Sequence, residues 1–278
     1  SRVLAGARAR TEKKLAAQRA ELADCARMDE YRRMGDLITS NLYKLKQGDT
    51  RVRLYDYGTE REVDVTLDGR LSPSKNAQRY YKKYAKAKHA QTVLTEQIAL
   101  AERELDYLSS VQDAVSRAGS ERDFAELRQE LALAGICGDA RASKSGKKGG
   151  RPAPSKPLTF TLTSGRTVRV GKNNLQNDAL TFGADKTDIW FHVKGFPGSH
   201  AVLFTGGAEP TDLDYTESAM LAAYHSKASG GVNVQVDYTP VRFVKKPAGA
   251  KPGYVIYDKY FTAVVRAELP DGVREEKK

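Results

Sequence analysis

The sequence predicts an α+β protein in which a long antiparallel coiled-coil arm with a small β-hairpin tip precedes an α+β sheet domain. Two long helix-forming segments, an alternating segment between them, and a series of short apolar runs further on carry this prediction. The predicted organisation is an arm and middle hairpin region over 1–137, a flexible basic linker over 138–157 and a sheet domain over 158–270.

The arm is predicted from composition and spacing. Residues 1–47 are rich in Ala, Arg, Lys, Glu and Leu and lack proline, so we expect a helix that ends at Gly48. Residues 50–68 alternate apolar and polar side chains around Gly58, which indicates a β-hairpin. A second helix then extends to Ser116 with apolar residues at 4-3 heptad spacing. The seam consists of Leu94, Ile98, Ala101, Leu105, Leu108 and Val115.

A third, shorter helix and a linker complete the first half of the chain. The segment "SERDFAELRQELALAG" offers Ser120 as N-cap and Gly135 just past the helix end. Residues 138–157 are rich in Gly and Lys and hold no large apolar residue, which is typical of a flexible linker.

The sheet domain is predicted from short strands and one main helix. "LTFTLTSGRTVRV" indicates a hairpin that turns at Ser164 and Gly165. "DIWFHV", "HAVLF", "VNVQVDYTPVRFV" and "YVIYDKYFTAVV" indicate further strands, and "TDLDYTESAMLAAYHSKA" indicates a helix capped by Thr211.

The charge of the chain points to a polyanionic partner. The formal net charge is +11, and the excess lies mainly on the helical arm and the linker. The two cysteines, Cys25 and Cys137, are far apart and outside any CxxC motif, which favours a reducing cytoplasm. No apolar run has the length of a membrane span, and the chain begins at Ser1 without Met, so we expect a cytoplasmic piece of a longer protein.

The stretch "DIWFHVKGFPGSH" holds the only tryptophan and two of the four histidines. His192 and His200 are eight residues apart with no cysteine nearby, which disfavours a zinc site, and Ser199 lies in no nucleophile elbow. We therefore expect no metal, no cofactor and no enzyme activity. Strand alternation places Ile189, Phe191 and Val193 on one face and Trp190, His192 and Lys194 on the other. The second face suits base stacking and phosphate contact, or equally a structural Trp with polar neighbours.

Two other segments could contact RNA. "GKNNLQND" carries Lys172, Asn173, Asn174 and Asn177 directly after a predicted strand, and such amides suit base edges or, alternatively, tight turns. "QRYYKKYAKAKHA" interleaves tyrosines with lysines on the arm, which suits an RNA backbone or a solvated face whose tyrosines pack on the hairpin. The arm candidates are Tyr80, Lys82, Lys83 and Lys86.

The order of motifs resembles the NFACT family, which includes bacterial fibronectin-binding protein A-like proteins, the bacterial alanine-tailing ribosome quality-control factor and the eukaryotic nuclear export mediator factor. The resemblance rests on "NLYKL" and "LDGRLSPSKNAQRYYKKY" in the arm. It continues with "GKNNLQND", "TDIWFHVKGFPGSH", "YHSKA", "VDYT", "VKKP" and "KPGYV", and it covers residues 10–265. Lys172 stands where many relatives have Arg, and lysine lacks the planar fork of that side chain.

The resemblance implies a C-terminal fragment made of the coiled-coil middle region and the RNA-binding domain called NFACT-R. It implies binding to large ribosomal subunits with stalled peptidyl-tRNA and recruitment of tRNA for alanine tailing, with neither a membrane nor DNA as partner. A surface adhesin that binds fibronectin is the alternative. The expected nucleic-acid-binding residues of the sheet domain are Lys172, Asn173, Asn174, Asn177, Trp190, His192, Lys194, Gly198, Ser199, His200 and Lys227.

Overall fold

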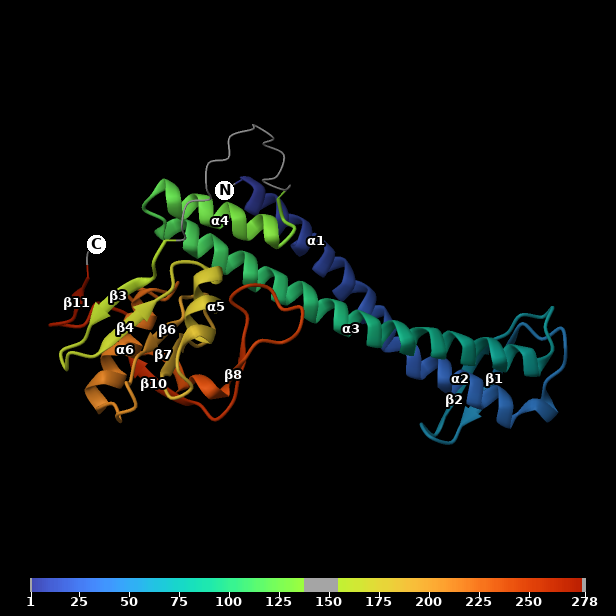
Figure 1. Ribbon diagram of the computed structural model, residues 1–278. Helices are drawn as coiled ribbons and strands as arrows, with labels where there is room; N and C mark the ends of the chain where they lie inside the picture. Colours follow the sequence, from blue (N-terminus) through green and yellow to red (C-terminus); the bar gives the residue numbers. More distant parts are fainter. Residues whose placement is uncertain (1, 138–154, 277–278) are drawn as a thin grey trace, which may run out of the picture. The chain divides into compact units, whose positions relative to one another are not determined.

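A computed structural model describes residues 2–137 and 155–276, so most of the predicted linker, residues 138–154, lies outside the described residues (Figure 1). The chain divides into two compact units. One comprises Arg10–Arg103, and the other joins the first nine residues to everything from Glu104 onward. The boundaries fall within helices α1 (Arg2–Asp24) and α3 (Pro73–Arg117), so each of these helices contributes to both units.

The first predicted helix is shorter and less regular than expected. A 3₁₀ turn, η1 (Cys25–Arg27), follows α1, and α2 (Met28–Ser40) ends before a second 3₁₀ turn, η2 (Leu42–Lys44). The prediction that the helix continues to residue 47 was therefore wrong. The polar residues at the end of α2 explain the stop. Thr39, Ser40 and Asn41 donate side-chain hydrogen bonds of 2.8–2.9 Å to carbonyl oxygens four residues earlier, which favours termination of the helix.

A hairpin packs on α2 and the start of α3, at the predicted position. Strands β1 (Arg51–Asp56) and β2 (Arg61–Thr66) pair antiparallel. Their inward side chains join one apolar cluster with those of α2 and α3. The members of this cluster are Met34, Leu37, Ile38, Leu45, Leu54, Val65, Leu67 and Ala77.

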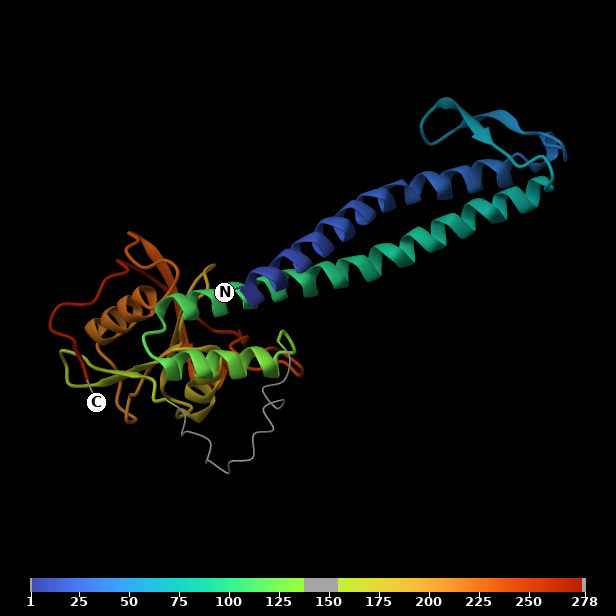
Figure 2. The same ribbon diagram turned by 90° about the horizontal axis from the view of Figure 1, so that it is seen from above.

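Helices α1 and α3 lie side by side over the rest of this unit (Figures 1 and 2). Leu15 of α1 and Leu94 of α3 are both buried. A hydrogen bond of 2.7 Å joins the amides of Gln18 and Gln97 across the pair. The apolar spacing read from the sequence therefore corresponds to a two-helix seam, into which polar contacts are inserted.

Asn76 fixes the entry of the chain into α3. The side chain is buried, its Oδ1 accepts from the backbone N–H of Asp68 at 2.7 Å, and its Nδ2 donates to the carbonyl of Asp68 at 3.0 Å. Longer bonds reach the carbonyls of Leu71 and Ser72. The side-chain amide of Asn76 thus provides hydrogen-bond partners for backbone groups at the point where the hairpin leads into α3.

The second unit contains the base of the arm and the sheet domain. Helix α4 (Glu121–Leu133) begins with a capping box between Ser120 and Asp123, and the prediction of Ser120 as N-cap is thereby confirmed. It packs on the ends of α1 and α3 in an apolar cluster. This cluster consists of Leu4, Ala7, Tyr107, Leu108, Val111, Ala114, Leu127 and Leu131.

The sheet has seven antiparallel strands in the order β10-β7-β5-β6-β4-β3-β11. The strands are β3 (Leu158–Thr161), β4 (Thr167–Val170), β5 (Ile189–Val193), β6 (Ala201–Leu203), β7 (Val234–Pro240), β10 (Phe261–Val265) and β11 (Arg274–Glu275). A 3₁₀ turn, η4 (Val241–Phe243), follows β7, and a separate pair is formed by β8 (Val244–Lys245) and β9 (Ile256–Tyr257).

Both faces of this sheet are covered. Helix α6 (Asp212–Tyr224), capped by Thr211 as predicted, packs on one face together with Ile189, Phe191 and Val193. A second helix, α5 (Asn174–Gly183), packs through Leu180 near the other face. The prediction of one main helix was therefore incomplete, because α5 begins within "GKNNLQND", a segment that was interpreted as a base-contacting stretch or, alternatively, a tight turn.

Both cysteines are free thiols, and of these Cys25 is buried and Cys137 is partly exposed. Within residues 2–137 and 155–276, none of the helices combines the length and apolarity needed to span a lipid bilayer.

We predict that Asn76→Ala destabilises the arm unit by about 1–3 kcal/mol, because it leaves the partly buried backbone N–H of Asp68 without its hydrogen-bond acceptor. Hydrogen exchange at the hairpin amides of residues 61–68 measures this loss, and the replacement of exposed Gln78 by Ala is the control. Equal protection in the two variants would contradict the role assigned to Asn76.

Candidate nucleic-acid interface

The segment "GKNNLQND" forms the start of α5. Asn173 is the N-cap, and its Oδ1 accepts from the backbone N–H of Gln176 at 2.9 Å. Asn173, Asn174 and Asn177 are buried, whereas Lys172 is partly exposed. The amides that we predicted for base contact are thus taken up by contacts inside the protein.

Helix α4 supplies most of those contacts. Asp123, Glu126 and Glu130 are spaced i, i+3 and i+7, so they share one face of the helix. Asp123 lies 3.8 Å from the ammonium of Lys172, and Glu126 Oε2 accepts from Nδ2 of Asn173 at 2.9 Å. Three carboxylates therefore meet the N-terminal end of α5, where backbone N–H groups favour negative charge.

Glu130 is the most enclosed of these carboxylates. Its Oε2 accepts from the backbone N–H of Asn174 at 3.1 Å and its Oε1 from Nδ2 of the same residue at 2.8 Å. That Nδ2 also donates to Ser110 Oγ on α3 at 2.8 Å. Burial raises the pKa of Glu130, and the hydrogen bonds from Asn174 oppose that rise. One asparagine thus joins α3, α4 and α5.

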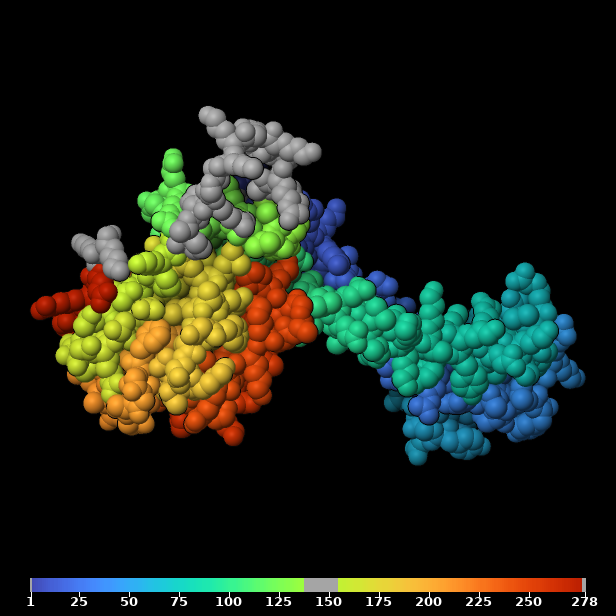
Figure 3. All heavy atoms as spheres, in the orientation of Figure 1, coloured from blue at the N-terminus to red at the C-terminus, as the bar shows by residue number. Residues whose placement is uncertain are grey.

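Neighbouring glycines leave room for these asparagines. A Cβ on Gly171 would lie 2.2 Å from Asn177 Oδ1, and one on Gly253 would lie 2.3 Å from Asn174 Oδ1. The Asn177 oxygen accepts from the backbone N–H of His200 at 3.1 Å. The order of glycines and asparagines in the motif therefore reflects close packing between backbone segments. Gly253 donates its backbone N–H to Asp178 Oδ1 on α5 at 3.1 Å. In Figure 3 the orange-red segment that follows β8 accordingly lies against the yellow surface of α5.

Trp190 is fully buried, which decides the question that strand alternation left open. The predicted division of β5 into two faces is confirmed, because Trp190 belongs to a different cluster from Ile189, Phe191 and Val193. Its ring contacts His192, His200 and Tyr257 at centroid distances of 5.7, 5.2 and 4.8 Å. Trp190 therefore offers no ring face to a base in this conformation.

The two histidines of the motif are neutral parts of the same aromatic group. Burial lowers the pKa of His192 to about 4, although Asp237 acts in the opposite direction. Burial, and then the nearby His192, hold the pKa of His200 well below its ordinary value. His200 Nδ1 lies 2.8 Å from Thr181 Oγ1 on α5. Among the described residues no group of three or more His, Cys, Asp or Glu side chains is arranged to hold a metal ion.

The turn after β5 is fixed from two sides. Gly198 forms an isolated β-bridge with Ser226, where a Cβ would lie 2.8 Å from the serine Cβ. Ser199 is buried, and its hydroxyl accepts from Arg117 Nη1 at the end of α3 at 3.0 Å. Gly198 and Ser199 therefore position the turn.

Exposed groups of the predicted set gather at this turn. Lys194 precedes it and is 44% exposed at its side chain, 3.6 Å from Asp237. Lys227 is exposed, and its backbone N–H donates to the carbonyl of Pro197 at 2.9 Å. Between them Phe196 is 50% exposed. Two cations and an aromatic ring at one turn can contact phosphate and an unpaired base together. Phe196 was missed as a candidate, although the quoted turn contained it.

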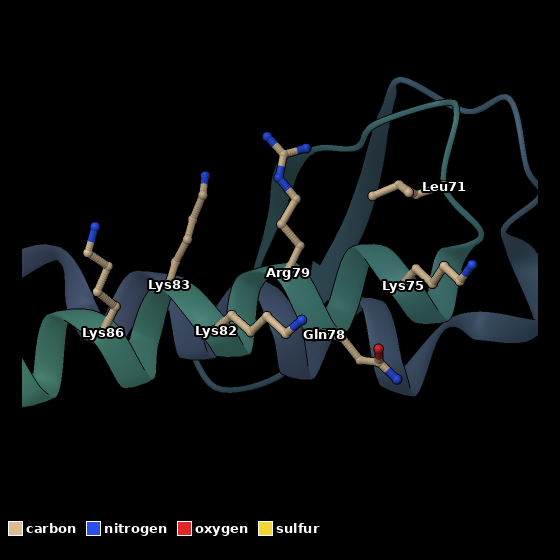
Figure 4. A pocket seen from close by; sticks show the side chains of 7 residues that line it. All are labelled: Leu71, Lys75, Gln78, Arg79, Lys82, Lys83 and Lys86. Carbon is tan, nitrogen blue, oxygen red and sulfur yellow. The ribbon is translucent and has the colours of Figure 1, made fainter.

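On the arm, the tyrosine and the lysines take different roles. Tyr80 packs against the hairpin cluster, and its hydroxyl donates to the carbonyl of Thr66 at 2.7 Å. Lys82, Lys83 and Lys86 are exposed. These lysines line an open groove of about 530 Å³ on α3 (Figure 4). The whole lining consists of Leu71, Lys75, Gln78, Arg79, Lys82, Lys83 and Lys86.

The groove is strongly basic. Arg79, Lys83 and Lys86 point to one side of α3, away from the helix axis (Figure 4). Arg79 lies 3.6 Å from Asp68, whereas Lys82 and Lys86 form no ion pair within the part of the chain that the structure describes. Lys75 and Arg79 were missed as candidates, although the i, i+4 spacing with Lys83 could have indicated them.

The family model described as "NFACT N-terminal and middle domains" matches residues 1–149, and the chain therefore belongs to the NFACT family. Among curated proteins, the chain is 41% identical over 253 residues to the Rqc2 homolog RqcH of Bacillus subtilis (strain 168), which covers 89% of this chain and 43% of that protein. It is also 41% identical over 250 residues to the Rqc2 homolog RqcH of Streptococcus suis (strain 05ZYH33), covering 89% and 44%. The chain therefore spans less than half the length of these relatives.

A solved structure has the same fold. It is described as the C-terminal part of the fibronectin/fibrinogen-binding protein from Streptococcus suis, and it matches with a TM-score of 0.74 and 34% identity. The match covers 96% of this chain and 92% of that one. The predicted fold class and the family resemblance are both confirmed by these comparisons.

We predict that His225 makes the sheet domain less stable in acid. Burial, and then the charge of Arg117, lower its pKa to about 4 from an ordinary 6.5. The unfolded chain therefore binds the proton more readily, and stability falls as pH decreases from 6.5 towards 4. Between pH 6.5 and 5, His225→Gln should reduce this loss by about 2 kcal/mol at most.

Urea unfolding followed by fluorescence of Trp190, the only tryptophan, measures this difference in the sheet domain. Only the change between the two pH values is compared, so a constant destabilisation by the substitution does not matter. Replacement of exposed His89 by Gln is the control. An identical pH response in wild type and His225→Gln would contradict the prediction.

Proposed function

We propose that this chain is the RNA- and ribosome-binding part of a ribosome quality-control factor, and that it acts by binding and without catalysis. In this proposal the whole protein engages large ribosomal subunits with stalled peptidyl-tRNA in the cytoplasm and recruits tRNA for alanine tailing of the nascent chain. Family membership and similarity to proteins named Rqc2 homolog RqcH support this assignment.

The basic groove on α3 is the observation that carries the proposal. It brings five cationic side chains to one open surface of helix α3, beside an aliphatic side chain at Leu71. Such a surface matches a nucleic-acid backbone, because each phosphate neutralised by Lys or Arg releases bound counterions. A protein partner would be expected to meet a more apolar surface with aromatic anchors.

In the sheet domain we assign contact with tRNA to the turn after β5. Lys194, Phe196 and Lys227 are exposed there, and Lys172 adds a partly exposed cation elsewhere in the domain. The buried members of the predicted set act as positioning residues. They are Asn173, Asn174, Asn177, Trp190, Ser199 and His200, with the half-buried His192 beside them.

Binding of fibronectin is a second candidate, favoured by one observation. The solved structure with the same fold is described as part of a fibronectin/fibrinogen-binding protein. The two functions predict different responses to salt, because binding dominated by phosphate contacts weakens steeply as salt rises. Competition between immobilised fibronectin and tRNA for the same protein separates them directly.

We predict that the double substitution Lys82→Ala and Lys86→Ala weakens binding to purified large ribosomal subunits about tenfold at moderate salt. Loss of two phosphate contacts should also reduce the slope of log affinity against log salt by roughly 1.5. Sedimentation with the subunits over a salt series measures both quantities.

A matched control removes the same charge from another exposed part of the arm unit, through Lys13→Ala and Lys14→Ala. If both variants lose affinity equally, bulk charge and not the groove determines binding. If neither variant changes affinity or slope, the groove has no part in the interaction.

We predict that Lys194→Ala with Lys227→Ala weakens binding of tRNA about tenfold, and that Phe196→Ala costs roughly 1–2 kcal/mol through loss of stacking. Fluorescence anisotropy with labelled tRNA measures each change. Lys186→Ala with Lys245→Ala, two exposed lysines of the same domain, is the control. Unchanged affinity in all three variants would remove the turn from the interface.

A further inference from the structure

Strand β10 forms an edge of the seven-stranded sheet, next to β7. No other strand pairs with its outer side among the described residues. An edge strand presents unpaired N–H and C=O groups, to which another extended chain can bind.

The register identifies which backbone groups point outward. Lys194 donates its backbone N–H to the carbonyl of Gln235, so Gln235 and Asp237 direct their backbone groups towards β5. The alternate residues of β7 therefore bond to β10, where Val236 is opposite Ala263. The backbone groups of Thr262 and Val264 consequently point away from the sheet.

Apolar side chains flank these open backbone groups on both faces. Phe261 is 65% exposed and Val264 is 60% exposed, and successive residues of a strand lie on opposite faces. Phe261 stacks on Tyr238 with ring centroids 5.7 Å apart, so the exposed ring is held in place. A chain lying along β10 would therefore find an apolar contact on each side of its backbone.

The two edges of the sheet differ in protection. The other edge strand, β11, consists of Arg274 and Glu275, and such charges discourage pairing with a further chain. Strand β10 has the sequence "FTAVV", with neither charge nor proline. The charged residues nearest its ends are exposed Lys259 before it and exposed Arg266 after it, with exposed Asp258 and Glu268 one and two residues further out.

We propose that β10 is a docking edge for an extended peptide segment of another protein, one that alternates apolar residues and carries acidic residues at its ends. Main-chain pairing with Thr262 and Val264 would supply the register, and Phe261 and Val264 would contact alternate side chains. The cations at the strand ends favour acidic flanks. A second copy of this chain fits less well, because a net charge of +11 opposes self-association.

The test uses a fluorescein-labelled probe with a central run of alternating Val and Thr and with Asp and Glu at both ends. Anisotropy titration with the full chain should give saturable binding. Val264→Pro removes an outward N–H and leaves the bonds to β7 intact, so it should weaken binding about tenfold. Val264→Thr keeps that N–H and is the matched control.

Two altered probes examine the recognition chemistry. N-methyl groups on the central Val and Thr residues should abolish binding, because they remove the backbone donors. Replacement of the acidic ends by Lys should weaken binding, because they would meet Lys259 and Arg266. Trp190 fluorescence and the thermal midpoint of Val264→Pro report whether the domain remains folded.

Several results would overturn the proposal. They are absence of saturable binding of the first probe, equal binding of the N-methylated probe, equal affinity of folded Val264→Pro, and a dimer in sedimentation equilibrium that Val264→Pro dissociates. Weaker binding of single-stranded RNA by Val264→Pro would likewise assign the edge to RNA. Unchanged tRNA affinity in that variant is expected, so failure here is distinguishable from failure of the proposed RNA function.

Discussion

The sheet domain depends on the contact between the acidic face of α4 and the N-terminal end of α5. Glu130 is buried there, and a buried carboxylate is tolerable only where hydrogen bonds satisfy its oxygens. Asn174 provides them, and it reaches Ser110 on α3 with the same amide. The position of α5 therefore follows from the helices at the base of the arm, and α5 in turn supports Trp190, His200 and the strands beneath them.

In the structure, the asparagines of "GKNNLQND" have a different role from the predicted contact with bases. Amides that looked suited to base edges are instead donors, acceptors and caps within the fold. Asn177 helps to fix the turn after β5, because its Oδ1 accepts a hydrogen bond from the backbone N–H of His200. Arg117 holds the same turn through a hydrogen bond to the hydroxyl of Ser199. The side chains exposed at this turn, chiefly Lys194, Phe196 and Lys227, are fewer than the residues of the predicted interface.

Local signals allowed much of the fold to be predicted from the sequence. The caps at Ser120 and Thr211, the hairpin around Gly58 and the alternation along β5 depend on neighbouring residues, and the structure has each of them. Helix α5 was not predicted because its cap, Asn173, and its first turn, which holds Asn174 and Asn177, are rich in asparagine, and asparagine favours turns by local propensity. In the structure, glutamates of α4 accept hydrogen bonds from Asn173 and Asn174. Burial of Trp190 could not be predicted either, because residues distant in sequence, such as Leu180 and Val244, cover that face.

The two kinds of polar contact in this chain differ in their sensitivity to ions. Helix α4 holds α5 mainly through hydrogen bonds from amides to the half-buried Glu126 and the buried Glu130, which mobile ions screen less than exposed charges. The lysines of the groove on α3 are exposed, so any partner held by them feels the full screening of the solution. A rise in salt or a competing polyanion would therefore release a partner bound in this groove without loosening the packing of the sheet domain, so such binding would be reversible at no cost in folded structure.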